Sequence, residues 1–292
     1  MPDSPVPDSP VPGHTVAGHT VSGRPVLDDG QVADAARRLL EAARTREPIR
    51  QLSLQYPDMT IEDAYRVQRA LVALKTAEGR SVQARKIGLT SRTMQQSVSI
   101  SEPDYGVIFD DMFFDDGGVV PFERFIRPRV EVELAFVLDR PLKGPGVTAL
   151  DVLDATRWVT PALEILDARV QMTDPETGHL RTIVDTISDN AADAGIVVGG
   201  RAVRPDACDL RRVAALLYVN EVIEESGVAA AVLNHPANGV AWLANKLAAY
   251  DESLPAAQVI LAGSFTRPVF AHAGDVFHAD FGDLGAVTCR FR

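Results

Sequence analysis

The sequence predicts an α+β protein whose helical N-terminal part precedes a body of short strands with flanking helices. Apolar residues follow helical spacing over much of residues 31–83, whereas short apolar runs broken by Gly, Pro and Asp dominate residues 84–292. The strand-like runs do not alternate regularly with helices, which argues against a doubly wound parallel sheet. We therefore expect a single domain made of these two parts, preceded by a tail over residues 1–30.

The predicted tail is the low-complexity stretch of the chain. PDSPV occurs at 2–6 and again at 7–11, and GHTV occurs at 13–16 and again at 18–21. Proline fixes φ and lacks an N–H donor, and Gly, Ser and Asp bury little surface. We expect this tail to be disordered and dispensable.

Helices are expected at four places. Apolar spacing indicates helices over 31–47 and 61–78, and the second carries a capping box at Thr60 and Asp63. Two further helical patterns cover 148–168, interrupted by Pro161, and 237–250. Strands are expected where short apolar runs stand between turn residues: VIF (107–109), VEVELAFVL (130–138), AGIVVGG (194–200), QVILAGSF (258–265) and AVTCRF (286–291).

Charge and cysteine usage limit the classes of function. The 292 residues include 29 Lys and Arg against 40 Asp and Glu, a net charge of −11, with no basic block interleaved with aromatic residues. This balance argues against partners such as nucleic acid or an anionic membrane surface. Cys208 and Cys289 form no C-x-x-C motif, and no apolar run approaches the roughly 20 residues of a membrane span. We expect a cytoplasmic protein without an export signal.

A pair of glutamates stands in the predicted strand 130–138. Side chains alternate between the two faces of a strand, so Glu131 and Glu133 share one face, roughly 6–7 Å apart at their Cα atoms. Two like charges on one face require a compensating cation. A solvated face of an edge strand explains the same pattern, and on this strand alone that interpretation is favoured.

A third carboxylate changes this balance. Glu164 lies in the apolar run TPALEILD (160–167), where an unpaired charge is costly. Three carboxylate oxygens with water suit a hard ion such as Mg²⁺ or Mn²⁺, whereas zinc prefers His or Cys ligands. Lys86, in RKIGLTS, and Asp104, in SEPDYG, are candidates for proton donor and acceptor beside this ion. A surface lysine and a turn aspartate are the alternatives.

One motif resembles a dinucleotide-binding loop, but its context argues against that function. GPGVTA (144–149) fits the dinucleotide fingerprint, but its glycines do not follow a strand directly, and Pro145 removes a backbone N–H that a phosphate would need. Thr148 and Asp151 explain these residues as a capping box.

Several motifs together resemble the hydratase/decarboxylase branch of the fumarylacetoacetate hydrolase superfamily, most nearly its enzymes that hydrate 2-oxo-hept-4-ene-1,7-dioate in homoprotocatechuate breakdown. The resemblance extends from about residue 31 to residue 292. It is carried by KIGLTS (86–91), EPDYG (102–106), DDMFF (110–114), PRVEVELAFVL (128–138), TPALEILDAR (160–169), DTISDNAADAG (185–195), NHPANGVAWLANKLA (234–248) and GSFTRP (263–268).

The resemblance implies a mixed β-roll with flanking helices and assembly into homo-oligomers, with possible association with a neighbouring pathway enzyme. It implies that Glu131, Glu133 and Glu164 bind the metal and that Lys86 and Asp104 act as acid and base. Candidates for binding the anionic small-molecule substrate, a 2-oxo dicarboxylate, are Arg92, Arg129 and Ser188.

The implied reaction is metal-dependent addition of water to a 2-oxo-alkenoate. Three alternatives stay open from the sequence. A sister decarboxylase acting on a 2-oxo-3-enedioate, a 2-hydroxypentadienoate hydratase and a non-catalytic metal-binding subunit of such a complex fit the same residues. Hydrolysis of a carbon–carbon bond in an acylpyruvate is disfavoured, because it calls for a His-activated water and no suitable histidine is evident.

Overall fold

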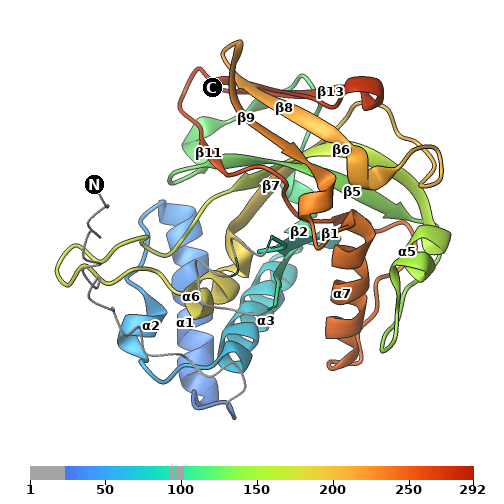
Figure 1. Ribbon diagram of the computed structural model, residues 1–292. Helices are drawn as coiled ribbons and strands as arrows, with labels where there is room; N and C mark the ends of the chain where they lie inside the picture. Colours follow the sequence, from blue (N-terminus) through green and yellow to red (C-terminus); the bar gives the residue numbers. More distant parts are fainter. Residues whose placement is uncertain (1–23, 92–94, 96–101) are drawn as a thin grey trace, which may run out of the picture.

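The computed structural model describes residues 24–91, 95 and 102–292 (Figure 1). It shows a mixed α+β fold in which curled sheets are flanked by helices, which confirms the predicted fold class. Residues 1–23 of the predicted tail lie outside the described ranges. Within those ranges, no helix is both long and apolar enough to cross a membrane.

The N-terminal helices form one layer beside the sheets. Helix α1 (Asp29–Thr45) packs against α3 (Ile61–Ala77), and α3 packs against α6 (Ile183–Ser188), while α2 (Leu52–Gln55) contacts α6. The capping box at the start of α3 is formed as predicted, and a second one starts α1. Both long helices predicted in this part of the chain are confirmed, with ends shifted by one or two residues.

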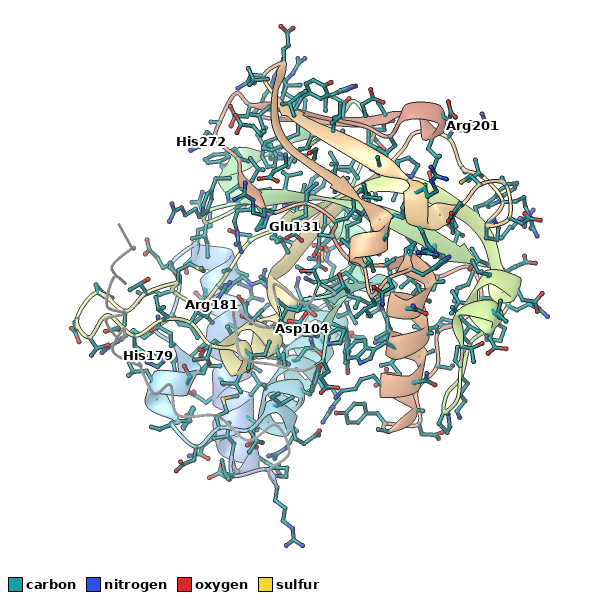
Figure 2. The ribbon with its side chains drawn as sticks, viewed as in Figure 1. Asp104, Glu131, His179, Arg181, Arg201 and His272 are labelled. Atoms are coloured by element: carbon teal, nitrogen blue, oxygen red, sulfur yellow. The ribbon has the colours of Figure 1, made fainter. Side chains whose placement is uncertain are left out.

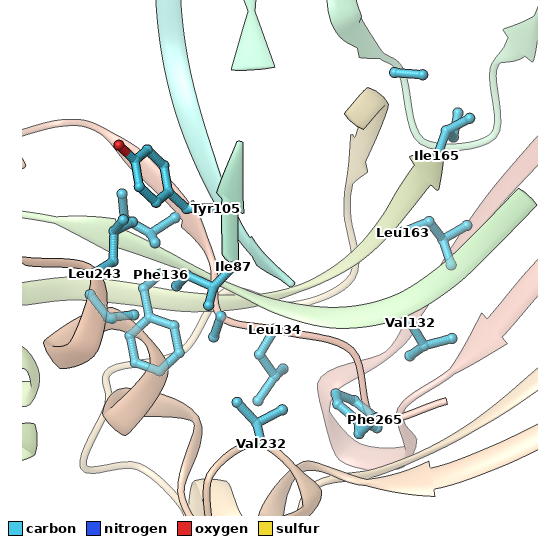
Figure 3. Packing of buried hydrophobic residues seen from close by; sticks show 14 of the residues in the cluster. Ile87, Tyr105, Val132, Leu134, Phe136, Leu163, Ile165, Val232, Leu243 and Phe265 are labelled. Atoms are coloured by element: carbon cyan, nitrogen blue, oxygen red, sulfur yellow. The ribbon is translucent and has the colours of Figure 1, made fainter. Parts of the chain in front are cut away.

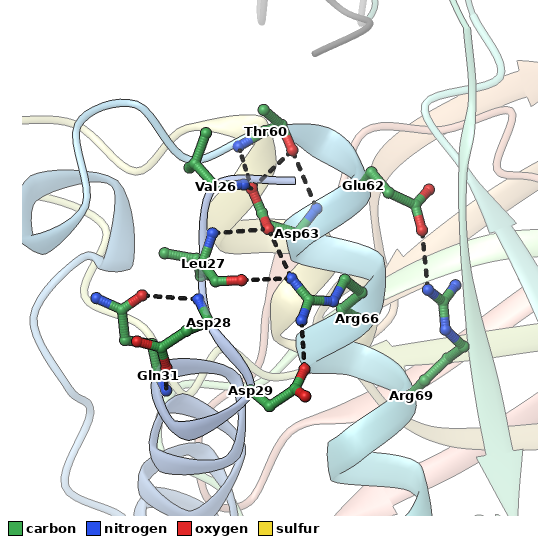
Figure 4. A network of polar contacts seen from close by, with 10 residues as sticks. All are labelled: Val26, Leu27, Asp28, Asp29, Gln31, Thr60, Glu62, Asp63, Arg66 and Arg69. Carbon is green, nitrogen blue, oxygen red and sulfur yellow. Dashed lines mark hydrogen bonds and ion pairs between the residues drawn. The ribbon is translucent and has the colours of Figure 1, made fainter. Parts of the chain in front are cut away.

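Residues 26–30, which were assigned to the tail, belong to the fold. The backbone N–H groups of Val26 and Leu27 donate to the carboxylate of Asp63, at 3.0 and 3.1 Å, and Leu27 is buried. Arg66 donates to the carbonyl of Leu27 and to Asp29 (Figure 4). Composition missed this segment because its anchor is a buried aspartate far along the chain.

Two sheets make up the rest of the molecule. In the larger sheet the strand order is β2-β1-β10-β5-β6-β7-β3, with β11 also paired to β5. Its strands are β1 (Val82–Gly88), β2 (Asp104–Phe109), β3 (Phe113–Phe114), β5 (Arg129–Leu138), β6 (Thr156–Leu166), β7 (Asp193–Val198), β10 (Val259–Leu261) and β11 (Val269–Phe270). The smaller sheet has the order β4-β13-β12-β8-β9 and contains β4 (Val119–Val120), β8 (Ala214–Val219), β9 (Val222–Val228), β12 (Val276–Asp280) and β13 (Ala286–Phe291).

The helix predicted over 148–168 is wrong beyond its first turns. The chain forms α5 (Ala149–Ala155), with the predicted capping box at Thr148, and then enters strand β6. The carbonyl of Pro161 accepts from the N–H of Gly199, just beyond the last residue pair of the β6–β7 ladder. Because the N and the carbonyl of one residue point to the same side of an antiparallel strand, the missing N–H of Pro161 falls at the end of this ladder, where a proline is tolerated. A continuous apolar run does not distinguish a buried strand from a buried helix.

One face of the larger sheet packs into the main hydrophobic core. Val132, Leu134 and Phe136 alternate along β5 and point toward Val232 and Phe265 (Figure 3). Helix α7 (Pro236–Ala248), close to the predicted 237–250, buries its apolar side in the same core. The other face of β5 is therefore turned toward the interior of the curled sheet, where the acidic residues lie.

Candidate metal centre and active site

Strand register places the three predicted glutamates on one face. Glu131 lies directly opposite Glu164 in the antiparallel pair of β5 and β6, and Glu133 lies opposite Ala162. Residues opposite each other point to the same side of a sheet, and so do residues two apart on one strand. One carboxylate oxygen from each glutamate lies within 4.8 Å of the others. The strands thus bring together the cluster that the sequence predicted.

Glu133 and Glu164 are buried and Glu131 is half-buried, and the cluster is incompletely paired. Glu133 Oε2 accepts from the N–H of Gly263 at 2.8 Å, whereas Oε1 has no hydrogen-bond partner among the described residues. Burial, together with the neighbouring Glu164, raises the pKa of Glu131 to about 8 and raises the pKa of Glu133 well above its usual range. Such a cluster strongly favours the arrival of positive charge.

Lys86 supplies one positive charge. Its register in β1 places it opposite Leu261 of β10, which in turn lies opposite Ala135, two residues after Glu133 on the same face. Lys86 Nζ lies 3.0 Å from Glu164 Oε1, and both side chains are almost fully buried. Burial lowers the pKa of Lys86, but the charges of Glu164 and Asp104 outweigh it, so the net pKa is raised and the ammonium is protonated.

Asp104 completes the group at the start of β2, where it pairs with Gly88 of β1. A side chain at Gly88 would place its Cβ 2.2 Å from Asp104 Oδ1, and one at Gly106 would lie 3.3 Å from Lys86 Cε. The two glycines therefore leave room for the acid and the lysine. Asp104 Oδ1 has no hydrogen-bond partner in the described part of the chain, and burial raises the pKa of Asp104.

A cavity of about 550 Å³ opens onto these residues. Lys86, Asp104 and Glu131 line it together with the segment before and within α6 and the turn after β10. Figure 2 shows the side chains of Asp104, Glu131 and Arg181 in the middle of the molecule, between the sheets and the helical layer. Ionisable groups with strongly shifted pKa values around one cavity are typical of an active site.

The donor set fits a hard divalent cation. Three carboxylates converge, Glu133 retains an orphaned buried oxygen, and the pKa values of Glu131 and Glu133 are raised by mutual repulsion and burial. Oxygen donors of this kind suit Mg²⁺, Mn²⁺ or Ca²⁺ rather than zinc.

The three predicted substrate-binding residues have different positions. Arg129 lines the cavity, with its guanidinium carbon 5.8 Å from the ring centre of Phe270. Ser188 is fully buried in α6, where its hydroxyl donates to the carbonyl of Val184, and it is not among the residues that line the cavity. Arg92 lies outside the described residues.

Sequence reasoning missed two features of this cavity wall. Arg181 lines the cavity directly before α6, in a turn-rich stretch without any motif. Residues 190–192 all adopt positive φ, and the amide of Asn190 exchanges two hydrogen bonds with the backbone of Val107 in β2. Strained backbone of this kind is concentrated at functional sites, but the sequence analysis did not predict the turn.

This fold and this site define the class of protein: the chain belongs to the fumarylacetoacetate hydrolase superfamily. Residues 82–292 match the family described as fumarylacetoacetate (FAA) hydrolase C-terminal. Among individual relatives, the chain is 62% identical to a 2-oxo-hept-4-ene-1,7-dioate hydratase of Escherichia coli, over 88% of this chain and 96% of that protein. It is 39% identical to a 2-hydroxyhexa-2,4-dienoate hydratase of Comamonas testosteroni, over 87% of this chain and 95% of that protein.

A solved structure shares the fold over nearly the whole chain. The 4-oxalocrotonate decarboxylase from Pseudomonas putida G7 matches with a TM-score of 0.87 and 33% identity, covering 92% of this chain and 100% of that one. That protein is described in complex with calcium and acetate, and also with magnesium and adipate. The resemblance inferred from the motifs is confirmed, and the relatives include both hydratases and a decarboxylase.

Proposed function

We propose that the chain is a divalent-metal-dependent hydratase that adds water to 2-oxo-hept-4-ene-1,7-dioate, or to its 2-hydroxydienoate tautomer, to give 4-hydroxy-2-oxo-heptane-1,7-dioate. The observation that carries this proposal is the convergence of Glu131, Glu133 and Glu164 beside Lys86 and Asp104 in one cavity. The 62% identity to a relative named for this reaction supports the choice of substrate.

The metal would be held by Glu131, Glu133 and Glu164, with Mg²⁺ or Mn²⁺ as the proposed ion. When bound, the cation supplies a Lewis acid for the oxygens of the 2-oxo acid. The sheet prepares the site because the three side chains project from two rigid neighbouring strands, whose pairing sets the spacing of the carboxylates.

Lys86 and Asp104 are proposed to move the protons. Water addition needs the double bond to shift into conjugation with the C2 carbonyl, and this shift and the addition both require proton transfer. Asp104 offers a buried oxygen without a partner in the described structure, which can accept a proton. Lys86 carries a proton beside it, and the pair is enclosed by Gly88 and Gly106.

A decarboxylase acting on a 2-oxo-3-enedioate is the second candidate, because the solved relative with a TM-score of 0.87 is a 4-oxalocrotonate decarboxylase. Incubation of the purified protein with Mg²⁺ and each substrate separates the two reactions. We expect a 4-hydroxy-2-oxo acid from the heptenedioate, measured by NMR. Release of CO₂ without hydration would refute the hydratase proposal, and no turnover of either substrate would favour a non-catalytic metal-binding subunit.

A further inference from the structure

Arg181 is a charged side chain in the cavity wall, and no ion pair to it is formed by any residue that the structure describes. Its Nη1 atom is buried and has no hydrogen-bond partner among the described residues, and no ion pair involves its guanidinium there. Residues 92–101, which are only partly described, contain no aspartate or glutamate. A guanidinium has five donors and no acceptor, and a buried unpaired charge is costly. Burial accordingly lowers the pKa of Arg181.

The two acids whose charges raise the pKa of Arg181, Asp189 and Asp185, are already engaged elsewhere. Asp189 accepts from the backbone N–H and the Nε of Arg169, at 2.7 and 2.5 Å. Asp185 accepts from the backbone and hydroxyl of Ser53, and it also caps α6 through Thr182. These bonds fix the two carboxylates on other groups, so the guanidinium retains its capacity to bind an anion.

The backbone holds Arg181 firmly at this position. Its N–H donates to the carbonyl of Met172 at 2.9 Å across a hairpin, which an isolated bridge between Thr173 and Leu180 extends. Arg50 anchors the far end of this hairpin through an ion pair with Asp174 at 2.6 Å. These contacts fix the backbone from which the guanidinium extends at the cavity wall, and a binding group needs such support.

The other cations of the cavity are less available. Lys86 is paired with Glu164, Arg267 is exposed and paired with Glu225, and Arg129 lies over a phenylalanine ring. Arg181 also lies near enough to Asp104 to lower the pKa of that carboxyl. The guanidinium therefore faces the same chamber as the acid–base pair.

We propose that Arg181 binds the second, distal carboxylate of the substrate and so makes the site selective for 2-oxo dicarboxylates over 2-oxo monocarboxylates. This inference rests on the proposed function, because a 2-oxo acid held at the carboxylate cluster leaves its far end to be recognised elsewhere in the cavity. A planar fork of donors binds a carboxylate through two parallel hydrogen bonds. Arg181 is thus a specificity-determining residue.

Two saturated probes test this assignment by binding, without turnover. 2-Oxoheptanedioate and 2-oxoheptanoate share a chain length and differ in the distal carboxylate, and neither has the double bond needed for hydration. We expect the Mg²⁺-loaded protein to bind the dioate more tightly in calorimetry. Arg181→Gln should weaken dioate binding about 10- to 100-fold and leave oxoheptanoate binding within about twofold. Arg181→Lys should retain part of the preference.

The control is Arg201→Gln, which removes an exposed arginine that does not line the cavity and should change neither affinity. Equal weakening of both probes by Arg181→Gln, or a wild-type protein without preference for the dioate, would overturn the assignment. If Arg181→Gln does not fold, an undiminished preference for the dioate in Arg181→Lys would overturn the assignment as well. A protein that shows the preference but does not hydrate the heptenedioate would refute the proposed reaction while supporting the role of Arg181.

Discussion

Glu131 of β5 and Glu164 of β6 lie directly opposite each other as cross-strand partners in an antiparallel pair. Like charges in this arrangement are destabilising, and here Glu164 is buried, Glu131 is half-buried, and the carboxylate of Glu133 lies beside both. Among the described residues, Lys86 makes an ion pair with Glu164 alone, at 3.0 Å, so one ammonium stands beside a cluster of three glutamates. The stability of the sheet is therefore linked to whatever positive charge enters the cluster.

The first prediction concerns pH and metal. Because burial and Glu164 raise the pKa of Glu131 from 4.5 to about 8, the folded protein holds a proton that the unfolded chain releases. In EDTA, the free energy of unfolding should therefore fall as pH rises from about 5 to 8. Mg²⁺ should raise Tm more at pH 8 than at pH 5, because ligation requires the deprotonated carboxylates. An equal Mg²⁺ shift at both pH values would contradict this.

The second prediction isolates Glu131. Glu131→Gln removes one of the proposed ligands and one acid with a raised pKa, so it should weaken Mg²⁺ binding at least about tenfold and flatten the decline of stability with pH in EDTA. Calorimetric titration with Mg²⁺ and thermal unfolding measure the two effects. Glu224→Gln, at an exposed position of β9, is the matched control and should change neither. Unaltered Mg²⁺ affinity in the Glu131 variant would remove this residue from the proposed ligands.

The third prediction separates the lysine from the metal. Lys86→Gln should lower kcat on the order of 100-fold or more, because one of the two proposed proton-transfer groups is lost. Its Mg²⁺ affinity should stay equal or increase, since the ammonium and the metal compete for Glu164. Steady-state kinetics with parallel calorimetry provides both values. A variant that loses metal binding and turnover together would show that Lys86 acts by supporting the cluster.

The fourth prediction uses the close approach at Gly88. Gly88→Ala would place a methyl group 2.2 Å from the present position of Asp104 Oδ1, so the carboxylate must move. Displacement of a catalytic group by about 1 Å costs on the order of 100-fold in rate. We expect kcat to fall while Mg²⁺ affinity changes little. Gly79→Ala is the control for the loss of a glycine, because no atom lies within 4 Å of the added Cβ and only the local backbone is strained. Full activity in Gly88→Ala would count against the proposed role of Asp104.

The fifth prediction concerns the N-terminal anchor. Asp63 is buried and accepts hydrogen bonds from Val26, Leu27 and Thr60. Asp63→Ala should therefore lower the free energy of unfolding by about 2–4 kcal/mol, as expected for loss of an N-cap partner and of bonds to a charge. A chain lacking residues 1–28 should unfold at lower temperature than one lacking residues 1–23, because only the longer chain retains Val26 and Leu27. Equal Tm values would show that this anchor contributes nothing.

Local patterns predicted much of the site. Alternation along a strand placed Glu131 and Glu133 on one face, since that period depends on two residues of a single strand. The partnership of Glu164 was inferred from its apolar surroundings, although the segment was assigned to a helix. The charge was informative because the cost of burying it does not depend on the type of secondary structure.

Long-range pairing set the limit of prediction. Leu27 joins the fold through Asp63, and Pro161 fits a strand through its position at the end of a ladder. Arg181 carries no sequence signal, because the lack of an ion-pair partner among the described residues depends on the bonds that Asp185 and Asp189 make with other segments. Such facts depend on which surfaces meet, and neither composition nor periodicity contains them.

The alignment of β1, β5 and β6 has a consequence for how the chain assembles. Successive side chains on a strand point to opposite faces. A register shift of one residue would therefore place a glutamate or Lys86 in the hydrophobic core and place aliphatic side chains on the polar face. Misaligned pairings are therefore high in free energy. The positions of the charged side chains therefore help to specify a single register for these strands, and a variant in which all of them are replaced by apolar residues would lose that part of the specification.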